Sequence, residues 1–512
     1  MRRFIFSFLP GGLFAVTAPV VFYVVNPDNR IFNSWRDILG PIFLTLAFFG
    51  AFYLLAYLFT HGFEVAGLIA AVLVIGAFYL WQIALALAVI VLIALLALKI
   101  ARRKIKYATI NYLLGMLALV LAGFYGAQLV LFLVQVPSTA SRALVDPVIA
   151  SEVDAPASGE KPDIYYIILD GYGRADMLEG IYGYDNSAFI KQLQDLGFVV
   201  PGSSRANYPR TVLSLGSSLN MQYLDTTASV MGDSPVWWPL EEVLYHSQVR
   251  DFLEDKGYRT IFLASGFDFT DIRDGDEYVK PFPIMLNNFE GGYVRFTSLS
   301  ILGDLNHLVS YPSYSTQRRT IQTIFAALPR VALETGPKFV FAHITAPHPP
   351  FVFDEAGNPV NPDYPYTLTD KMRLIMDVPT YKQSYTAEVR YLNSRVIKTV
   401  GAILANSRTP PVIIIQGDHG PGLYMDDQSA ANTCLYERFS ILNAYYLPGK
   451  QSVPIPASIT PVNTFRLVFN EYFSTHFTQL ANKSYFESLA RFYAFQDVTD
   501  QIRPACAQQH QP

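Results

Sequence analysis

Residues 162–171 read PDIYYIILDG, and residues 411–420 read PVIIIQGDHG. Each stretch holds a continuous apolar run of strand length, and an acidic residue follows the run, Asp170 in the first and Asp418 in the second. Strands that are apolar on both faces are typical of parallel sheets, because helices cover both sides of such sheets. The sequence therefore predicts an α/β domain over residues 162–505, with a mostly parallel central sheet and helices on both faces.

Polar residues follow two further apolar runs in the same way. TIFLA at 260–264 is followed by Ser265, and FVFA at 339–342 is followed by His343. In open parallel sheets, ligands bind beyond the carboxyl ends of the strands. We therefore expect the chemistry of the domain at this edge of the sheet.

A metal site is predicted from the acidic residues that follow the first and last of these runs. Asp418 and His419 lie between two glycines, and together with Asp170 they offer oxygen and nitrogen ligands. Such a mixed set suits Zn²⁺ or Mn²⁺ better than Ca²⁺. The alternative for the pair alone is a strand-to-loop turn with a hydrogen-bonded aspartate.

A candidate nucleophile lies in the stretch NYPRTVLS at 207–214. A helix is expected over 211–220, so Thr211 stands at a helix start, where free N–H groups favour anions. A metal ion would lower the pKa of the Thr211 hydroxyl and make it nucleophilic. Arg210 and Asn207 lie close enough to assist a bound phosphate. The alternatives are an N-cap role for Thr211 and surface positions for the other two.

Two histidines occur in the proline-rich stretch HITAPHPPF at 343–351. The prolines exclude a helix, so a rigid loop is expected to leave the strand here. His348 is predicted to contact substrate, because a histidine at this edge can bind a phosphate oxygen or protonate a leaving group. His343 is a second substrate-binding candidate, or alternatively a buried support.

The composition indicates a membrane protein. Of 512 residues, 51% are hydrophobic and 16% are charged, and the mean hydropathy is +0.24. That is more apolar than a typical soluble protein. The net charge of −4 gives no sign of a nucleic-acid partner. Two cysteines, Cys434 and Cys506, lie too far apart for a thiolate metal motif, and whether they pair is left open.

The first 136 residues are predicted to form a five-helix transmembrane anchor. The expected spans are 4–25, 38–60, 64–81, 83–100 and 108–135. The alternative is four spans, with one long helix over 64–100. Five spans place both basic clusters, Arg2-Arg3 and residues 102–106, on the cytoplasmic side. The N-terminus is then cytoplasmic, and everything after a linker at 137–161 lies outside the plasma (inner) membrane, ending in a tail at 506–512.

This pattern resembles the alkaline-phosphatase superfamily, specifically its sulfatase-like membrane branch of lipoteichoic-acid synthases, phosphoglycerol transferases and phosphoethanolamine transferases. The resemblance covers the membrane anchor and essentially all of residues 162–505. It implies one metal ion, Mn²⁺ or Zn²⁺, held by Asp170, Thr211, Asp418 and His419. It also implies that the loop histidine, His348, contacts the transferred group.

Two features depart from that branch. Its transferases usually carry Glu at the position of Asp170. An Asp at this position is closer to the phosphatases and phosphomutases of the superfamily. Sulfatases need a Cys or Ser in a C/S-x-P-x-R signature for conversion to formylglycine, and that signature is absent here. A different register would place Asn207 at the nucleophile position. A second metal is possible, with Asp268 and His348 as candidate ligands.

The resemblance implies a phosphoryl-type transferase. Thr211 would take a phosphoglycerol or phosphoethanolamine group from a phospholipid donor as a phosphothreonine intermediate. The group would then pass to an envelope glycan or lipid. The alternatives are a membrane-tethered phosphodiesterase or phosphatase, a sulfatase, and a non-catalytic scaffold for envelope assembly. Donor, acceptor, metal and oligomeric state stay open.

Overall fold

The computed structural model describes residues 2–79, 107–137, 144–148, 161–297, 309–310, 312–370, 374–450 and 452–504. The chain forms two compact units. Unit 1 comprises residues 1–137, 236–238 and 284–311, and unit 2 comprises the remainder. The two short returning segments were not anticipated from the sequence, and the predicted domain boundaries stay a prediction.

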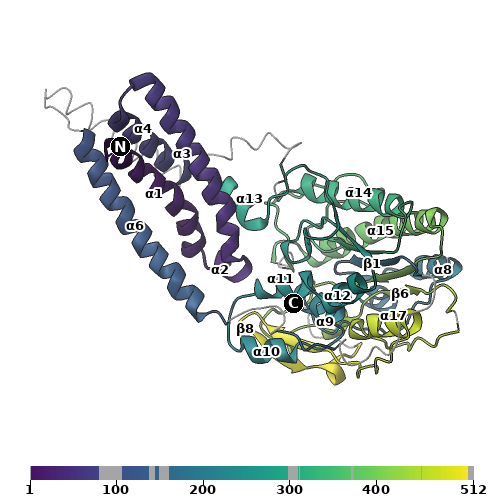
Figure 1. Ribbon diagram of the computed structural model, residues 1–512. Coiled ribbons are helices and arrows are strands. Elements are labelled where there is room, and N and C mark those ends of the chain that lie inside the picture. Colours follow the sequence, from purple (N-terminus) through teal and green to yellow (C-terminus); the bar gives the residue numbers. More distant parts are fainter. Residues whose placement is uncertain are drawn as a thin grey trace. The chain divides into compact units, whose positions relative to one another are not determined.

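Unit 1 is a group of apolar helices (Figure 1). Its long helices are α1 (Arg2–Val25), α3 (Leu39–Thr60), α4 (Phe63–Phe78) and α6 (Tyr107–Gln135), and its short ones are α2 (Pro27–Phe32), η1 (Trp35–Ile38) and α13 (Asn288–Phe296). Polar side chains join α1 to α3: Thr45 Oγ1 donates to the Ala15 carbonyl at 2.7 Å, and Ser7 Oγ lies 3.0 Å from Tyr53 Oη. Such bonds satisfy polar groups in an apolar helix bundle.

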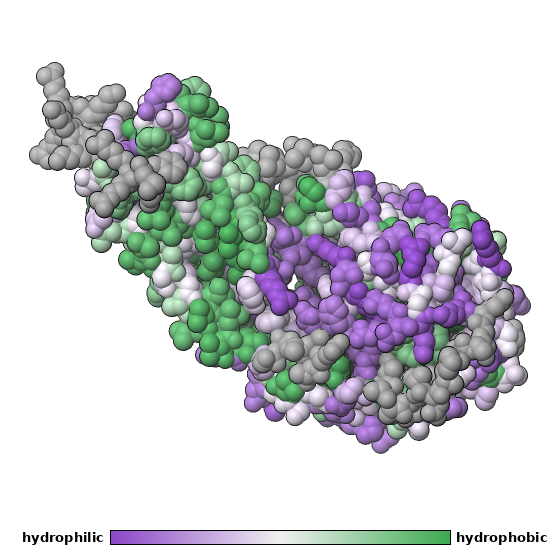
Figure 2. All heavy atoms as spheres, in the orientation of Figure 1, coloured by the Kyte–Doolittle hydropathy of each residue, from purple (hydrophilic) through white to green (hydrophobic). Residues whose placement is uncertain are grey.

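The outer surface of these helices is apolar (Figure 2). Phe43, Phe59 and Val134 are 72%, 86% and 79% exposed. Exposing side chains of this size to water is unfavourable, so this surface suits a lipid environment.

Three stretches in the described part of the chain are long and apolar enough to cross a membrane, Phe6–Val25, Trp35–Thr60 and Tyr107–Gln135. They match the predicted spans 4–25, 38–60 and 108–135. The predicted span 64–81 corresponds to the shorter apolar helix Phe63–Phe78. The span 83–100 lies outside the described residues, so the count of five helices is not confirmed.

Unit 2 is built on a six-stranded sheet in the order β3-β2-β4-β1-β5-β6. The strands are β1 (Ile164–Leu169), β2 (Arg259–Leu263), β3 (Glu277–Val279), β4 (Lys338–Ile344), β5 (Val412–Gln416) and β6 (Asn443–Tyr446). All neighbours pair in parallel except β5 and β6, which are antiparallel. The four strands predicted from apolar runs are β1, β2, β4 and β5, and the mostly parallel sheet is confirmed.

Alternate residues of β1 enter two different layers, as the pleat of a strand requires. Tyr165, Ile167 and Leu169 belong to a core with residues of four helices, α7 (Ala175–Tyr182), α8 (Ser187–Asp195), α14 (Tyr314–Val331) and α15 (Val378–Asn406). On the other face, Tyr166 bonds Ser218 of α9 (Thr211–Asn220) at 3.0 Å and packs on Phe465 of α17 (Thr464–Phe473). Helices therefore cover both faces, as predicted.

The helices of unit 2 are α7 (Ala175–Tyr182), α8 (Ser187–Asp195), α9 (Thr211–Asn220), α10 (Asp225–Met231), α11 (Pro239–Tyr245), α12 (Gln248–Asp255), α14 (Tyr314–Val331), α15 (Val378–Asn406), α16 (Leu435–Phe439) and α17 (Thr464–Phe473), with 3₁₀ turns η4 (Asp268–Thr270), η7 (Pro461–Asn463) and η8 (Thr499–Gln501). A separate hairpin pairs β7 (Tyr485–Ser488) with β8 (Arg491–Asp497). Helix α9 begins at Thr211, the residue predicted from the sequence.

Candidate active site

The three central strands carry their polar residues to one edge of the sheet. β1 lies between β4 and β5, and Ile168 of β1 is level with His343 on one side and Gln416 on the other. Asp170 follows β1 directly, and Asp418 and His419 follow β5. The predicted convergence of these side chains is therefore present in the fold.

Asp170, Asp418 and His419 form a buried group whose ligand atoms all lie within 4.8 Å of one another. His419 Nε2 is 3.4 Å from Asp170 Oδ1 and 3.4 Å from Asp418 Oδ2. Both of these carboxylate oxygens are shielded from solvent and have no hydrogen-bond partner among the described residues. Burying two unpaired carboxylate oxygens so close together is costly unless a cation joins them. The group therefore fits a divalent metal ion.

The remaining atoms of this group are held by the surrounding backbone. Asp418 Oδ1 accepts hydrogen bonds from the N–H of Gly171 at 3.1 Å and of His419 at 3.0 Å. Gly171 has φ of 71°, a left-handed conformation that glycine adopts without steric cost. Asp418 thus keeps Oδ2 for the candidate metal.

His419 is in the protonation state that a metal ligand needs. Its Nδ1–H donates to the Gly420 carbonyl at 2.9 Å, which leaves the lone pair of Nε2 for the group. Burial, followed by the nearby Arg438 charge, lowers the pKa of His419 to about 4. The ring is therefore neutral at physiological pH.

Thr211 presents its hydroxyl to the same point. Thr211 Oγ1 lies 3.2 Å from His419 Nε2, and the residue is buried with 7% exposure. One turn along α9, Ser214 Oγ donates to the Asp418 carbonyl at 2.7 Å and joins the helix to the loop that carries Asp418 and His419. The fold therefore places the Thr211 hydroxyl, the candidate nucleophile, beside the candidate metal ligands.

His343 lies beneath the group, in β4. Its Nε2 is 3.3 Å from Asp170 Oδ2 and has no hydrogen-bond partner among the described residues. Its Nδ1 lies 2.7 Å from Thr270 Oγ1, from the η4 turn. His343 is fully buried, and its side chain contacts Asp170 and is not exposed to solvent. Its predicted contact with substrate stays a prediction.

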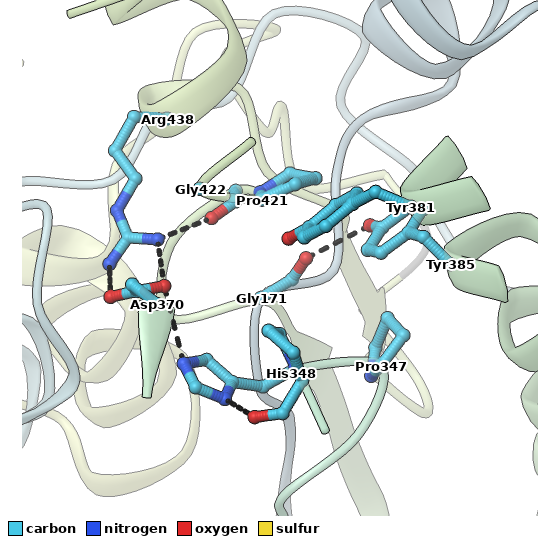
Figure 3. Close-up of a pocket in the computed structure, with 11 residues that line it drawn as sticks. Gly171, Pro347, His348, Asp370, Tyr381, Tyr385, Pro421, Gly422 and Arg438 are labelled. Atoms are coloured by element: carbon cyan, nitrogen blue, oxygen red, sulfur yellow. Dashed lines mark hydrogen bonds and ion pairs between the residues drawn. The ribbon is translucent and has the colours of Figure 1, made fainter. Parts of the chain in front are cut away.

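His348 lies near His419 and contacts residues that the sequence did not point out. His348 Nε2 is 3.3 Å from Asp370 Oδ1, and Arg438 holds the same carboxylate through both of its terminal nitrogens (Figure 3). The rings of His348 and His419 are 6.1 Å apart. Burial lowers the pKa of His348, but the Asp170 and Asp370 charges outweigh it and raise that pKa to about 9.

The two candidate phosphate contacts beside Thr211 are engaged in other interactions. Arg210 Nε lies 2.9 Å from Glu487 Oε1, and its Nη2 donates to Asp427 at 3.1 Å. Asn207 donates to the Lys483 carbonyl at 2.8 Å and accepts from the Val462 N–H at 2.8 Å. Asn207 therefore joins backbone segments, and the substrate-binding roles of both residues stay predictions.

For a second metal ion, the described residues offer no further group of ligands like the one formed by Asp170, Asp418 and His419. In the part of the chain that the structure describes, the group formed by Asp170, Asp418 and His419 is the only one with three or more suitable ligands. Asp268 and His348 do not belong to it.

Asp370 and Arg438 were not predicted from the sequence, because neither follows a predicted strand nor lies in a recognisable motif.

The Sulfatase family profile matches residues 162–465, more than half of the chain. The chain belongs to the sulfatase family. The predicted resemblance to the sulfatase-like branch is thereby confirmed, and the protein is a sulfatase-like hydrolase or transferase. No curated protein matches the chain in sequence.

Solved structures with low similarity include the zinc complex of the C-terminal periplasmic domain of EptC from Escherichia coli, with 13% identity, a TM-score of 0.43, and coverage of 70% of this chain and 99% of that one. The corresponding domain of the phosphoethanolamine transferase EptC from Campylobacter jejuni has 11% identity, a TM-score of 0.37, and coverage of 63% and 92%. A 2-O GAG sulfatase, BT1596, has 14% identity, a TM-score of 0.40, and coverage of 65% and 74%. At these scores the comparisons carry no argument about substrate.

Proposed function

We propose that this sulfatase-family protein is a membrane-anchored, metal-dependent transferase that moves a phospholipid head group, phosphoglycerol or phosphoethanolamine, to an envelope glycan or lipid. The observation that carries the proposal is the 3.2 Å approach of Thr211 Oγ1 to His419 Nε2, inside the group that fits a metal ion. A buried hydroxyl at this position is suited to act as a nucleophile.

Asp170, Asp418 and His419, together with the Thr211 hydroxyl, would hold one divalent ion, Mn²⁺ or Zn²⁺. When bound, such an ion lowers the pKa of a neighbouring hydroxyl and offsets negative charge on a phosphoryl group. Threonine cannot be the formylglycine precursor on which sulfatases depend. Phosphoryl transfer therefore agrees better with Thr211 than sulfate-ester hydrolysis does.

The reaction proceeds in two steps. Thr211 Oγ releases its proton and forms a bond to phosphorus, the bond from phosphorus to the diacylglycerol oxygen breaks, and that oxygen takes up one proton to give free diacylglycerol. An acceptor hydroxyl then attacks the phosphothreonine, the bond from Thr211 Oγ to phosphorus breaks, and a proton returns to the Thr211 hydroxyl. His348 Nδ1 is held by the Pro349 carbonyl and its Nε2 faces the site, so Nε2–H is suited to donate a hydrogen bond to an oxygen of the phosphoryl group.

The apolar helices support a lipid donor. The described residues contain three stretches that are long enough to span a membrane, and an enzyme anchored there meets phospholipids directly. We place the protein in the plasma (inner) membrane with the N-terminus in the cytoplasm and unit 2 outside. A phosphodiesterase of the same site, with water as acceptor, is the second candidate, because Asp170 replaces the usual Glu of the transferases.

The test is head-group release by the detergent-purified protein. Wild type and Thr211→Ala are each loaded with Mn²⁺ or Zn²⁺ and incubated with fluorescent phosphatidylglycerol or phosphatidylethanolamine. Diacylglycerol release by wild type alone supports the proposal, and transfer of the head group to an added acceptor separates the transferase from the phosphodiesterase. Release that survives the substitution would refute the role of Thr211, and no release from metal-loaded wild type would refute the lipid donor.

A further inference from the structure

A single carboxylate engages both cations beside the candidate active site. Arg438 Nη1 donates to Asp370 Oδ1 and Nη2 to Oδ2, each at 2.9 Å, and His348 Nε2 lies 3.3 Å from Oδ1 (Figure 3). The Arg438 side chain is 1% exposed and that of Asp370 is 17% exposed. Asp370 therefore occupies an enclosed position between a guanidinium and an imidazole.

This arrangement has the geometry of an anion-binding site. A guanidinium that presents two parallel N–H groups recognises the paired oxygens of a carboxylate or a phosphate equally well. Two non-bridging oxygens of a phosphoryl group would fit the same pair of N–H groups. The Asp370 carboxylate thus binds Arg438 in the same way as such a phosphoryl group would.

The site lies between the metal-binding loop and the nucleophile. Arg438 Nη1 also donates to the Gly420 carbonyl at 3.1 Å, and its Nε donates to the Pro209 carbonyl at 2.6 Å. Gly420 follows His419, and Pro209 precedes Thr211 by two residues. These bonds fix the guanidinium beside the candidate reacting groups, so an anion held there would be close to both.

His348 has no free ring nitrogen while Asp370 is in place. Its Nδ1 donates to the Pro349 carbonyl at 2.6 Å, and its Nε2 faces Asp370. A hydrogen bond from His348 to a substrate oxygen therefore requires that the Asp370 carboxylate withdraw.

We propose that Arg438 and His348 form a subsite for the non-bridging oxygens of a phosphoryl group, and that the Asp370 carboxylate occupies this subsite until substrate displaces it. The assignment of a phosphoryl ligand rests on the function proposed above. Exchange of one anion for another keeps Arg438 and His348 paired at every stage, which avoids the cost of an uncompensated buried cation. It also prevents Asp370 and a substrate anion from facing each other at short range.

The first test measures binding rather than turnover. Inorganic phosphate and dihexanoyl phosphatidylglycerol are each titrated calorimetrically into the metal-loaded, full-length protein in detergent, as wild type and as Asp370→Asn. A site that must first lose an internal occupant binds with reduced apparent affinity. We expect Asp370→Asn to bind inorganic phosphate about tenfold more tightly. The same or weaker binding by a variant that retains its metal would overturn the proposal.

A matched control removes the carboxylate of another Arg–Asp pair. Asp274 lies 2.8 Å from Arg250 of α12 and is not part of the site. Asp274→Asn is expected to bind phosphate as wild type does. If Asp370→Asn binds the lipid more tightly than wild type does, the subsite accepts the oxygens of a phosphodiester. If it binds only inorganic phosphate more tightly, the subsite accepts free phosphate.

A second measurement needs no substitution, in case Asp370→Asn does not fold. Amide hydrogen exchange of residues 361–370 is followed in the metal-loaded wild type, with and without saturating inorganic phosphate. Exchange is expected to become faster with phosphate, because the ligand displaces Asp370 from Arg438. Unchanged or slower exchange would overturn the proposal. Since neither measurement depends on head-group release, failure of the lipid assay and failure of this subsite are distinguishable.

Discussion

Thr211 Oγ1 lies 3.2 Å from His419 Nε2, although 208 residues separate the two in the sequence. The contact joins the first residue of α9 to the loop that follows β5. His419 Nδ1 donates to the Gly420 carbonyl, so Nε2 is directed at the Thr211 hydroxyl. The candidate nucleophile and the candidate metal ligand therefore face the same point, and this relationship is directly testable.

Thr211→Val keeps the shape of the side chain and removes its hydroxyl. We expect head-group release to fall about 10³-fold or more, because the nucleophile is lost. Metal content, measured by mass spectrometry, should fall far less than activity does, because Asp170, Asp418 and His419 remain. Thr211→Ser, which retains a hydroxyl, is the control and should keep part of the activity. Full activity in the valine variant would exclude Thr211 as nucleophile.

Asp418→Asn should weaken metal binding, because the amide replaces an anionic oxygen at Oδ2. In wild type, metal at about 100 times its dissociation constant should add about 2.7 kcal/mol of stability, seen as a rise in melting temperature. The variant should lose most of this rise and much of its bound metal. Asp233→Asn, whose side chain is 92% exposed in wild type, should behave as wild type does. An equal rise in both variants would remove Asp418 from the ligand set.

Gly420→Ala should disturb the loop that carries His419. A Cβ at this position would stand 2.0 Å from the Glu437 carbonyl oxygen, which is backbone and cannot rotate away. We expect a loss of about 1–3 kcal/mol in the free energy of unfolding, together with weaker metal binding. Gly401→Ala in α15 is the control, since a Cβ added there would meet no described atom within 4 Å apart from its chain neighbours and the helix's own backbone. It should be neutral or stabilising by up to about 1 kcal/mol.

The stability of unit 2 should depend on pH through Glu388. This carboxyl is fully buried, and burial raises its pKa to about 8, despite hydrogen bonds from the Val352 and Phe353 N–H groups to Oε1. From about pH 4.5 to 8 the folded state keeps a proton that the unfolded state has released. The contribution of Glu388 to stability therefore falls as pH rises through this range, by an amount on the order of a few kcal/mol, and is constant above it.

Glu388→Gln should remove the contribution of Glu388 to this dependence, since glutamine does not titrate, and should leave the contributions of the buried Glu437 and Glu487, whose pKa values are also raised by burial. The difference in melting temperature, variant minus wild type, should increase between pH 5 and pH 8. Glu355→Gln, at a side chain that is 63% exposed in wild type, should leave the wild-type slope unchanged. A parallel slope in wild type and Glu388→Gln would show that Glu388 is not the group responsible.

Cys434 is disulfide-bonded, and the only other cysteine of the chain is Cys506, which lies outside the described residues. Disulfides persist in oxidising compartments, in agreement with a position of unit 2 outside the cytoplasm. Labelling of the denatured, unreduced protein with a thiol reagent should detect no free thiol. Two labelled thiols per chain would contradict the disulfide, and labelling after reduction is the positive control.

The sequence by itself determined the strands and the candidate metal ligands. β1, β2, β4 and β5 were predictable because each is a continuous apolar run with a polar residue after it. Parallel strands bring their carboxyl ends to one edge, so Asp170 and Asp418 could be placed together without coordinates. The start of α9 at Thr211 was predictable for a similar local reason, since a proline and a hydroxyl residue mark a helix start.

The tertiary structure alone decided what surrounds that group. Asp370 and Arg438 are 68 residues apart in the sequence, and neither belongs to a pattern of helical or strand periodicity. The return of residues 284–311 to the helical unit is equally invisible in the sequence. The physical reason is the same in both cases. Strand and helix starts follow from the chemistry of neighbouring residues, whereas ion pairs and raised pKa values depend on which distant segments the fold buries together.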